Sequence, residues 1–142
     1  MTSLQQSGRR VGAQRPRVEL VPDAKVTSAG LDAIELAAIA GLHLDEWQRN
    51  VLIGSLGEVR PGKWAAFEVG AVVPRQNGKG SILEARELAG MFLFEEKLII
   101  HSAHEFKTAA EAFNRILGLV QNTPDLDAQV SKVSTAHGSE GI

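Results

Sequence analysis

The sequence predicts an α/β fold in which a parallel sheet is flanked by helices. Two apolar runs, at 64–73 and 97–101, alternate with segments of helical periodicity. Strands that alternate with helices of this length favour a parallel sheet with right-handed crossovers. Hydrophobic residues make up 44% of the 142 residues and charged residues 23%, so the chain has enough apolar material for a core.

Residues 1 to 26 are expected to form a flexible basic segment ahead of the folded part, which would span residues 27 to 142. The segment carries four arginines before Glu19, has prolines at 16 and 22, and shows no sustained period. A solvated tail and an arm that contacts phosphate are both open interpretations. The shortness of the basic stretch favours the tail.

Two helices are expected after this segment. The first covers Ser28 to Ala40, because Ser28 can cap a helix, apolar residues recur on one stripe, and Gly41 can end it. The second begins near Asp45, whose charge suits a helix N-terminus, and ends near Gly57. Pro61-Gly62 then predicts a turn.

The run from Trp64 to Val73 predicts a buried strand in the centre of a parallel sheet. Pro74 would end it, because proline has no N–H group for the ladder. Beyond the loop that follows, helical spacing of apolar residues predicts a helix from about Gly80 to Phe94.

Lys97 to His101 predicts a second strand. Ser102 and Glu105 form a capping-box pattern, and the apolar residues behind it keep helical spacing from Phe106 to Val120. Thr123-Pro124 predicts the end of that helix. The stripe on it is expected to belong to the core.

The loop RQNGKGS, residues 75–81, joins the first predicted strand to a helix and carries the chemistry. A strand, a loop with Gly-Lys and a helix form the context of a P-loop, where main-chain N–H groups point at phosphates. Lys79 can reach phosphate oxygens as a mobile charge, and Arg75 offers a planar fork. On the pattern alone, an ordinary glycine turn with solvent-exposed cations is an equal alternative, which the flanking elements disfavour.

This loop departs from the common pattern G-x-x-x-x-G-K-[ST] at two positions. Val73 stands where the first glycine is expected. Gly80 stands where the Mg²⁺-binding hydroxyl is expected, and Ser81 follows one place later. The metal-binding group is therefore either Ser81, after a shift of the loop, or a bridging water.

The segment Pro74-Arg-Gln-Asn-Gly-Lys79 resembles the variant phosphate loop of tailed-phage terminase large subunits. Residues 101–113 are similar to the strand-and-helix motif that follows the loop in that family, and Leu44-Asp-Glu-Trp-Gln48 resembles its adenine-recognising Q motif. The three motifs stand in the family's order over about residues 42 to 118, and the tail HGSEGI at 137–142 is also similar.

The resemblance implies the N-terminal part of a P-loop ATPase domain that binds ATP and Mg²⁺. In the family this ATPase drives DNA into a procapsid, and the full-length protein also cleaves DNA. Lys79 would bind phosphate, and Arg75 would contact the γ-phosphate and help couple hydrolysis to motion. Gln48 would read the adenine with Trp47 beside the base, Ser81 would be the metal ligand, and loop amides would come from Gln76, Asn77, Gly78 and Gly80.

The implied partners are double-stranded DNA, a portal protein and a small terminase subunit, with a homo-oligomeric ring in the host cell cytoplasm. The net charge of −2 and the pI of about 6.1 disfavour a generally basic nucleic-acid binder, but leave DNA contact through a local patch open. No apolar run approaches the roughly 20 residues that cross a bilayer, and no partner membrane is expected. The absence of cysteine excludes disulfides and thiol catalysis.

The family also needs an acidic Walker B pair at the end of a further strand. After residue 118 no apolar run ends in Asp-Glu, and Asp125 and Asp127 lie in a stretch that is too polar. The family's coupling motif and its nuclease are not found in the sequence either. We therefore expect a sheet truncated before the Walker B strand and a chain that does not hydrolyse ATP by itself.

Several alternatives stay open. Another helicase-like P-loop ATPase would also combine a Q motif with a phosphate loop, and a non-catalytic nucleotide-binding fragment would need no Walker B acid.

Gln48 lies three residues after Asp45, so it could simply close a capping box. His101 and His104 have a spacing that can bind metal, but a polar contact is favoured. For the two tryptophans, packing in the core is the plainer interpretation. For Glu68, the plainer interpretation is that it faces a partner of opposite charge.

Overall fold

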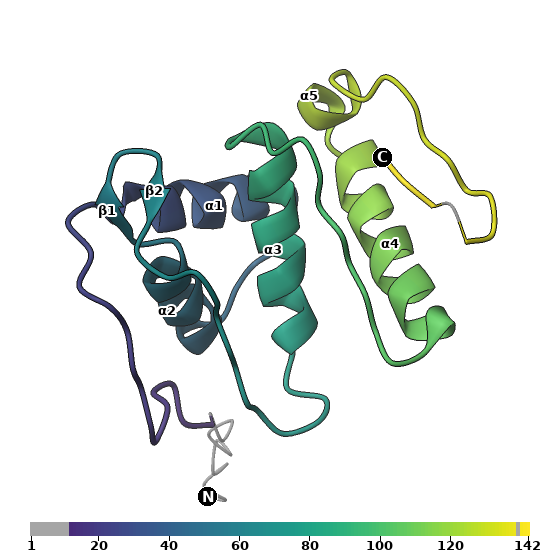
Figure 1. Ribbon diagram of the computed structural model, residues 1–142. Coiled ribbons are helices and arrows are strands. Elements are labelled where there is room, and N and C mark those ends of the chain that lie inside the picture. Colours follow the sequence, from purple (N-terminus) through teal and green to yellow (C-terminus); the bar gives the residue numbers. More distant parts are fainter. Residues whose placement is uncertain (1–11, 139) are drawn as a thin grey trace, which may run out of the picture.

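The computed structural model describes residues 12–138 and 140–142. Helices α1 (Ser28–Ile39), α2 (Glu46–Ser55) and α3 (Lys79–Phe92) pack against one another (Figure 1). Helix α4 (Phe106–Gln121) and the short α5 (Pro124–Asp127) lie on the other side of α3. Helix α3, which directly follows the candidate loop, therefore stands between the two helical groups.

The core consists of two apolar clusters that meet along α3. In the first, the small side chains of α1 pack against Leu52 of α2, against Leu56 directly after it, and against the α3 residues Ile82, Ala85 and Ala89. In the second, Leu88 of α3 joins apolar residues of α4, namely Ile116 and Val120. Because its apolar stripe is wide, α3 contacts helices on two sides, which fixes the position of its first turn.

The four main helices form where the apolar periodicity predicts them. Helix α3 begins at Lys79, one residue before the expected start. Helix α4 begins at Phe106 with Glu105 as the residue before it, and no side chain caps it. The capping box expected from Ser102 to Glu105 is therefore wrong, since the chain enters the helix only at the end of that pattern.

The sheet differs from the expected one. Among the described residues the named strands are β1 (Glu58–Arg60) and β2 (Lys63–Trp64), an antiparallel pair around the predicted turn at Pro61-Gly62. The segments at 64–73 and 97–101, which the sequence predicts as strands, are extended but form no strand beyond Trp64. The expectation of hydrogen-bonded parallel strands at these two places is not met.

The reason is that an extended segment becomes a strand only when a neighbour supplies ladder partners. The β-branched and apolar residues signal a preference for burial between layers, but they do not provide the neighbour. In the described chain Phe67 and Val72 are fully exposed, and Leu98 and Ile100 are 76% and 78% exposed. The first segment leads to the start of α3, and the second leads away from its end. The chain direction of both segments is therefore antiparallel to that of the helix (Figure 1).

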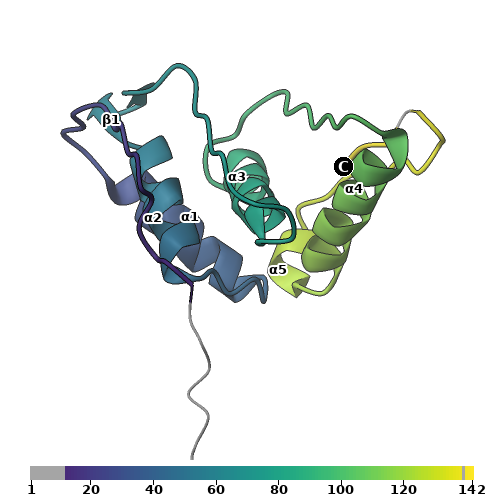
Figure 2. The ribbon, with the colours of Figure 1, turned by 90° about the horizontal axis from the view of Figure 1, so that it is seen from below.

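The described part of the N-terminal segment, residues 12–26, is irregular and lies along α2 and β1 (Figure 2). The main-chain N–H of Trp47 donates to Oε1 of Gln14 over 3.1 Å. The main-chain N–H groups of Lys25 and Val26 donate to the carbonyl oxygen of Glu58. Of the four arginines, Arg9 and Arg10 lie outside the described residues, while Arg15 and Arg17 are exposed.

In the part of the chain that the structure describes, no helix combines the length and the apolar character needed to cross a bilayer.

Candidate functional site

The loop before α3 turns sharply at two left-handed residues. Gln76 has a φ of 57° and Gly78 a φ of 73°, and Gly78 is the residue that caps α3. A left-handed conformation costs a residue with a side chain about 1 kcal/mol or more, so Gln76 carries backbone strain. Turns of this kind can orient successive main-chain N–H groups toward one anion.

The main-chain donors of this loop have no acceptor in the part of the chain that the structure describes. Within residues 12–138 and 140–142, no acceptor pairs with the N–H groups of residues 75 to 80. The first N–H groups of a helix have no partner inside the helix, and here the loop adds further free donors directly before them. A row of N–H donors of this kind binds an anion more readily than any other ligand.

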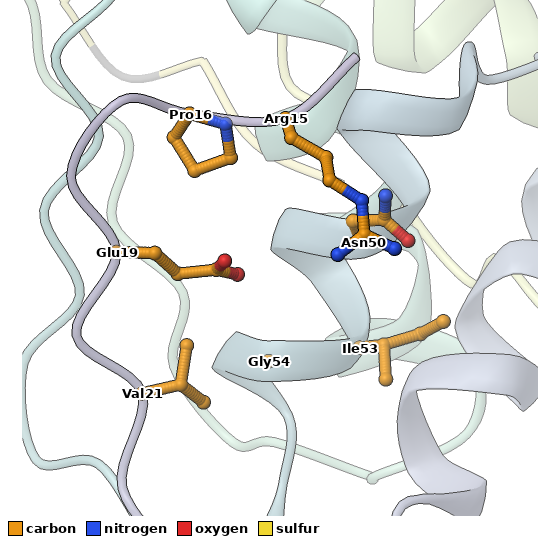
Figure 3. A pocket seen from close by; sticks show the side chains of 7 residues that line it. All are labelled: Arg15, Pro16, Glu19, Val21, Asn50, Ile53 and Gly54. Carbon is orange, nitrogen blue, oxygen red and sulfur yellow. The ribbon is translucent and has the colours of Figure 1, made fainter.

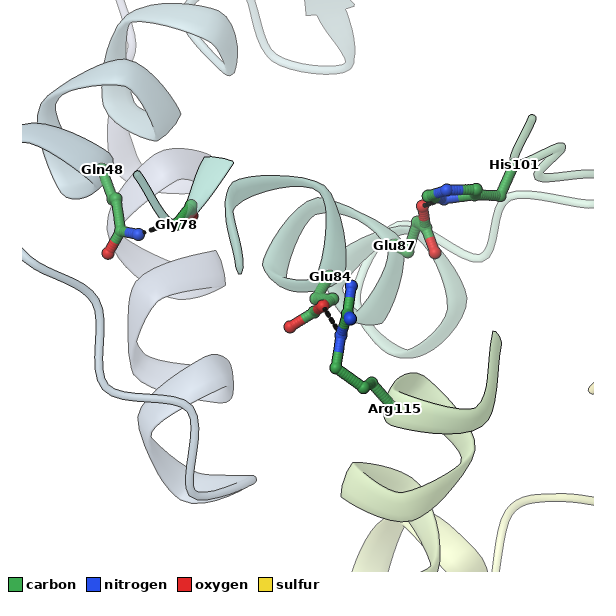
Figure 4. A network of polar contacts seen from close by, with 6 residues as sticks. All are labelled: Gln48, Gly78, Glu84, Glu87, His101 and Arg115. Atoms are coloured by element: carbon green, nitrogen blue, oxygen red, sulfur yellow. Dashed lines mark hydrogen bonds and ion pairs between the residues drawn. The ribbon is translucent and has the colours of Figure 1, made fainter. Parts of the chain in front are cut away.

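The side chain of Gln48 binds the main chain of the loop and attaches it to α2. Its Nε2 donates to the carbonyl oxygen of Gly78 over 2.7 Å (Figure 4). Its Oε1 accepts from the main-chain N–H of Asp45, also over 2.7 Å. The side chain is almost completely buried, at 4% exposure. The capping-box interpretation of Gln48 is thus confirmed, and the same amide also ties α2 to the loop.

Trp47 and the loop border the same depression. This open hollow of about 1240 Å³ lies between the N-terminal segment, α2 and the extended segment that leads to the loop. Its lining includes Trp47 and the loop residues 76–78, together with the carboxylates of Asp45 and Glu68. Trp47 also packs against the first apolar cluster, so the interpretation as a core residue holds for part of its surface.

The two cations predicted to act on phosphate are exposed. Neither Arg75 nor Lys79 has an ion-pair partner among the described residues, and neither lines the large depression. The structure therefore brings Trp47, Gln48 and residues 76–78 together, and it leaves Arg75 and Lys79 beside them with free side chains.

A further ion pair, which the sequence does not predict, lies beside the first turn of α3. Nε of Arg115 on α4 donates to Oε1 of Glu84 on α3 over 2.5 Å (Figure 4). A Cβ placed on Gly80 would lie 3.3 Å from Nη2 of Arg115 and 3.6 Å from Oε1 of Glu84. The sequence carries no local signal for this contact, because its two residues are 31 positions apart.

The predicted metal ligand Ser81 is half-buried in the first turn of α3. Its N–H donates to the carbonyl oxygen of Gly78 over 3.2 Å, and its hydroxyl makes no hydrogen bond within the described part of the chain. No three His, Asp or Glu side chains of the described residues gather where they could hold a metal ion. The assignment of Ser81 to Mg²⁺ therefore rests on the sequence resemblance.

The histidines after α3 take separate positions. His101 contacts Glu87 of α3, with 2.6 Å between Nδ1 and Oε1, which fastens the second extended segment to the helix (Figure 4). His104 is exposed, and its Nε2 lies 3.9 Å from a carboxylate oxygen of Glu105. The two rings thus contact different carboxylates.

A smaller recess of about 470 Å³ lies between α2 and the N-terminal segment (Figure 3). Arg15, Glu19 and Asn50 present polar groups to it, and Val21 and Ile53 present apolar ones. It shares most of its lining with the large depression but includes no residue of the loop. We therefore place the candidate site at the loop and the large depression.

The chain matches no protein-family model, and comparisons with curated proteins and with solved structures give no match either.

Proposed function

We propose that this chain binds the phosphates of ATP at the loop 74–80 and forms the N-terminal part of a P-loop ATPase domain. By its sequence resemblance, that domain would belong to the DNA-packaging motor of a tailed phage. One observation carries the proposal: a row of main-chain N–H groups, unpaired within the described residues, ends in a helix N-terminus beside two cations that have no ion-pair partner there. This arrangement matches the charge and the hydrogen-bonding needs of a triphosphate.

The helix supplies the fixed part of this site. Aligned peptide dipoles give the N-terminus of α3 a partial positive charge, and packing of α3 on two sides holds that end in place. Lys79 is the first residue of the helix and Arg75 lies at the start of the turn. Both side chains can move onto an anion at the loop without first breaking an ion pair.

The large depression offers room for the nucleoside on the side of Trp47. The indole of Trp47 is half-buried and can pack beside a base. The amide of Gln48 already serves Asp45 and Gly78, so its main part in binding would be to hold the loop. This modifies the role that the Q-motif resemblance implies for Gln48.

Binding without turnover is the expected behaviour of the 142 residues alone. Hydrolysis needs a group that orients and activates water, and the sequence carries no Walker B pair for it. If Mg²⁺ accompanies the phosphates, the hydroxyl of Ser81 or a bridging water beside the loop would have to bind the ion. DNA, portal protein, small terminase subunit, ring assembly and the host cytoplasm are proposed from the resemblance alone.

Calorimetric titration of ATP with Mg²⁺ tests the proposal. We expect Lys79→Ala to weaken binding at least tenfold, which is about 1.4 kcal/mol. Lys107→Ala is the matched control, because Lys107 is an exposed lysine in the first turn of α4 and makes only a loose contact with Glu111. Both variants are checked for folding by circular dichroism.

The outcomes separate the alternatives. Equal loss of binding in both variants, or no binding by the folded wild-type chain, would refute the loop as a phosphate site. Binding with measurable ATP turnover would exclude the non-catalytic fragment as the description of this chain.

A further inference from the structure

The ion pair between Glu84 and Arg115 joins a buried carboxylate to an exposed guanidinium. Glu84 is buried, with a side chain that is 6% exposed, whereas the side chain of Arg115 is 54% exposed. Only Nε of the guanidinium contacts the carboxylate. Within the described residues, neither terminal nitrogen of Arg115 makes a hydrogen bond.

A second pair in the same molecule shows the contrast. Arg86 binds Glu96 through both terminal nitrogens, with distances of 3.0 Å and 2.6 Å, and its guanidinium lies 6.0 Å from the ring centre of Trp64. That fork-to-fork geometry satisfies the arginine within the protein. In Arg115, by contrast, the two terminal nitrogens have no acceptor within the described residues, so they can donate to a bound anion.

The free end of Arg115 lies at the candidate loop. A Cβ on Gly80 would lie 3.3 Å from Nη2, so the guanidinium lies directly beside the space that a side chain at position 80 would take. Gly80 is the second residue of α3, and its own N–H has no protein partner in the described chain. An anion at this N–H would be within reach of the fork.

We propose that Arg115 is a phosphate-contacting residue for the nucleotide bound at the loop, and that Glu84 is a positioning residue that aims it. This inference rests on the proposed function and extends it to α4. The buried carboxylate holds Nε and so directs the terminal nitrogens toward Gly80. Together with Arg75 and Lys79, Arg115 places a third cation around the triphosphate, and the ligand joins α3 to α4.

Arg115 also lies beside a position at which the loop departs from the common pattern. In that pattern a hydroxyl follows the lysine, whereas here the residue is Gly80. A side chain at this position would make a tight contact with the guanidinium, which would have to shift by a few tenths of an ångström.

The test compares ATP, AMP and inorganic triphosphate as ligands of the full chain. We expect Arg115→Gln to weaken binding of ATP and triphosphate about tenfold, and binding of AMP less than twofold. Arg115→Lys should restore part of the affinity, because a lysine keeps the charge but not the fork. Glu84→Gln should weaken ATP about threefold, since a neutral acceptor holds Nε less firmly.

Arg86→Gln is the matched control, because it breaks an ion pair of α3 that lies among Trp64 and Phe94. It should leave the ratio of ATP to AMP affinity unchanged. Thermal unfolding of each variant separates loss of fold from loss of contact, and Arg115→Lys serves if the glutamine variant does not fold.

Two results would overturn the inference in distinguishable ways. If Lys79→Ala loses ATP binding while Arg115→Gln and Arg115→Lys bind ATP as the wild type does, the pair only joins two helices. If the folded wild-type chain binds neither ATP nor triphosphate, the phosphate loop itself fails and the inference fails with it.

Discussion

The amide nitrogen of Gln48 lies 2.7 Å from the carbonyl oxygen of Gly78, while the amide oxygen of the same side chain lies 2.7 Å from the main-chain nitrogen of Asp45. One buried side chain thus joins the start of α2 to the loop before α3. The loop is otherwise exposed, so this contact is its main attachment to the helical core.

The change Gln48→Glu should free the loop and keep the cap of α2. A glutamate can still accept from Asp45, but it cannot donate to Gly78. Loss of one buried hydrogen bond costs about 1 kcal/mol, and repulsion between the new carboxylate and the carbonyl oxygen adds to it, so the loop should open at least roughly fivefold more often. Trypsin cleavage after Arg75, measured without nucleotide, should speed up by this factor.

The matched control for that experiment is Gln121→Glu, which makes the same charge change at an exposed position of α4. An unchanged cleavage rate in Gln48→Glu would mean that the loop keeps its shape without the amide. A large loss of helical signal would show instead that the cap had failed.

Gly78→Ala should strain the loop in a second way. Gly78 has a φ of 73°, and a Cβ there would lie 2.8 Å from Nε2 of Gln48. The left-handed conformation alone costs an alanine about 1 kcal/mol, and the contact adds to it. Urea unfolding should show a loss of about 1–2 kcal/mol, whereas Gly70→Ala, with open space around it, should change little. Equal stability of the two variants would contradict the left-handed turn.

Gly30→Ala should destabilise the packing of α1 on α2. A Cβ at Gly30 would lie 2.6 Å from Cα of Ile53, and a backbone atom cannot move aside as a flexible side chain can. Overpacking of this kind costs about 1–3 kcal/mol, although alanine is the better helix former.

Gly118→Ala is the control for that change, because Gly118 lies inside α4 with no atom within 4 Å of the added methyl group. It should stabilise the chain by about 0.5–1 kcal/mol through helix propensity. Opposite signs of the two effects in urea unfolding would support the close contact, and two stabilising changes would contradict it.

The exposed apolar side chains of the extended segments should cause self-association. Phe67 and Val72 are fully exposed on the first segment, whose main chain forms no strand beyond Trp64 in the described structure. Extended, apolar and unpaired segments are templates for strand pairing between copies. Sedimentation velocity should show association that rises with concentration and falls in the double variant Phe67→Ser, Val72→Thr.

Leu20→Ser is the control, because Leu20 is 93% exposed on the N-terminal segment outside the two extended segments. It should leave the association nearly unchanged. A monodisperse monomer of the wild type at high concentration would show that the extended segments do not pair between copies.

The sequence by itself determined the helices of this protein and the position of its loop. Periodic apolar residues define a buried stripe within one segment, and that signal is local. It places α1, α2, α3 and α4 to within a few residues. The Gly-Lys pair before α3 likewise marks the loop without knowledge of any other segment.

Only the tertiary structure decided which segments have partners. The apolar residues at 64–73 and 97–101 predict burial, but a ladder needs a second main chain, and among the described residues only the start of the first segment, at Trp64, has one. The contact from Gln48 to Gly78 and the pair of Glu84 with Arg115 join residues 30 and 31 positions apart. Such contacts depend on how the helices pack, because packing and not local spacing brings distant side chains together.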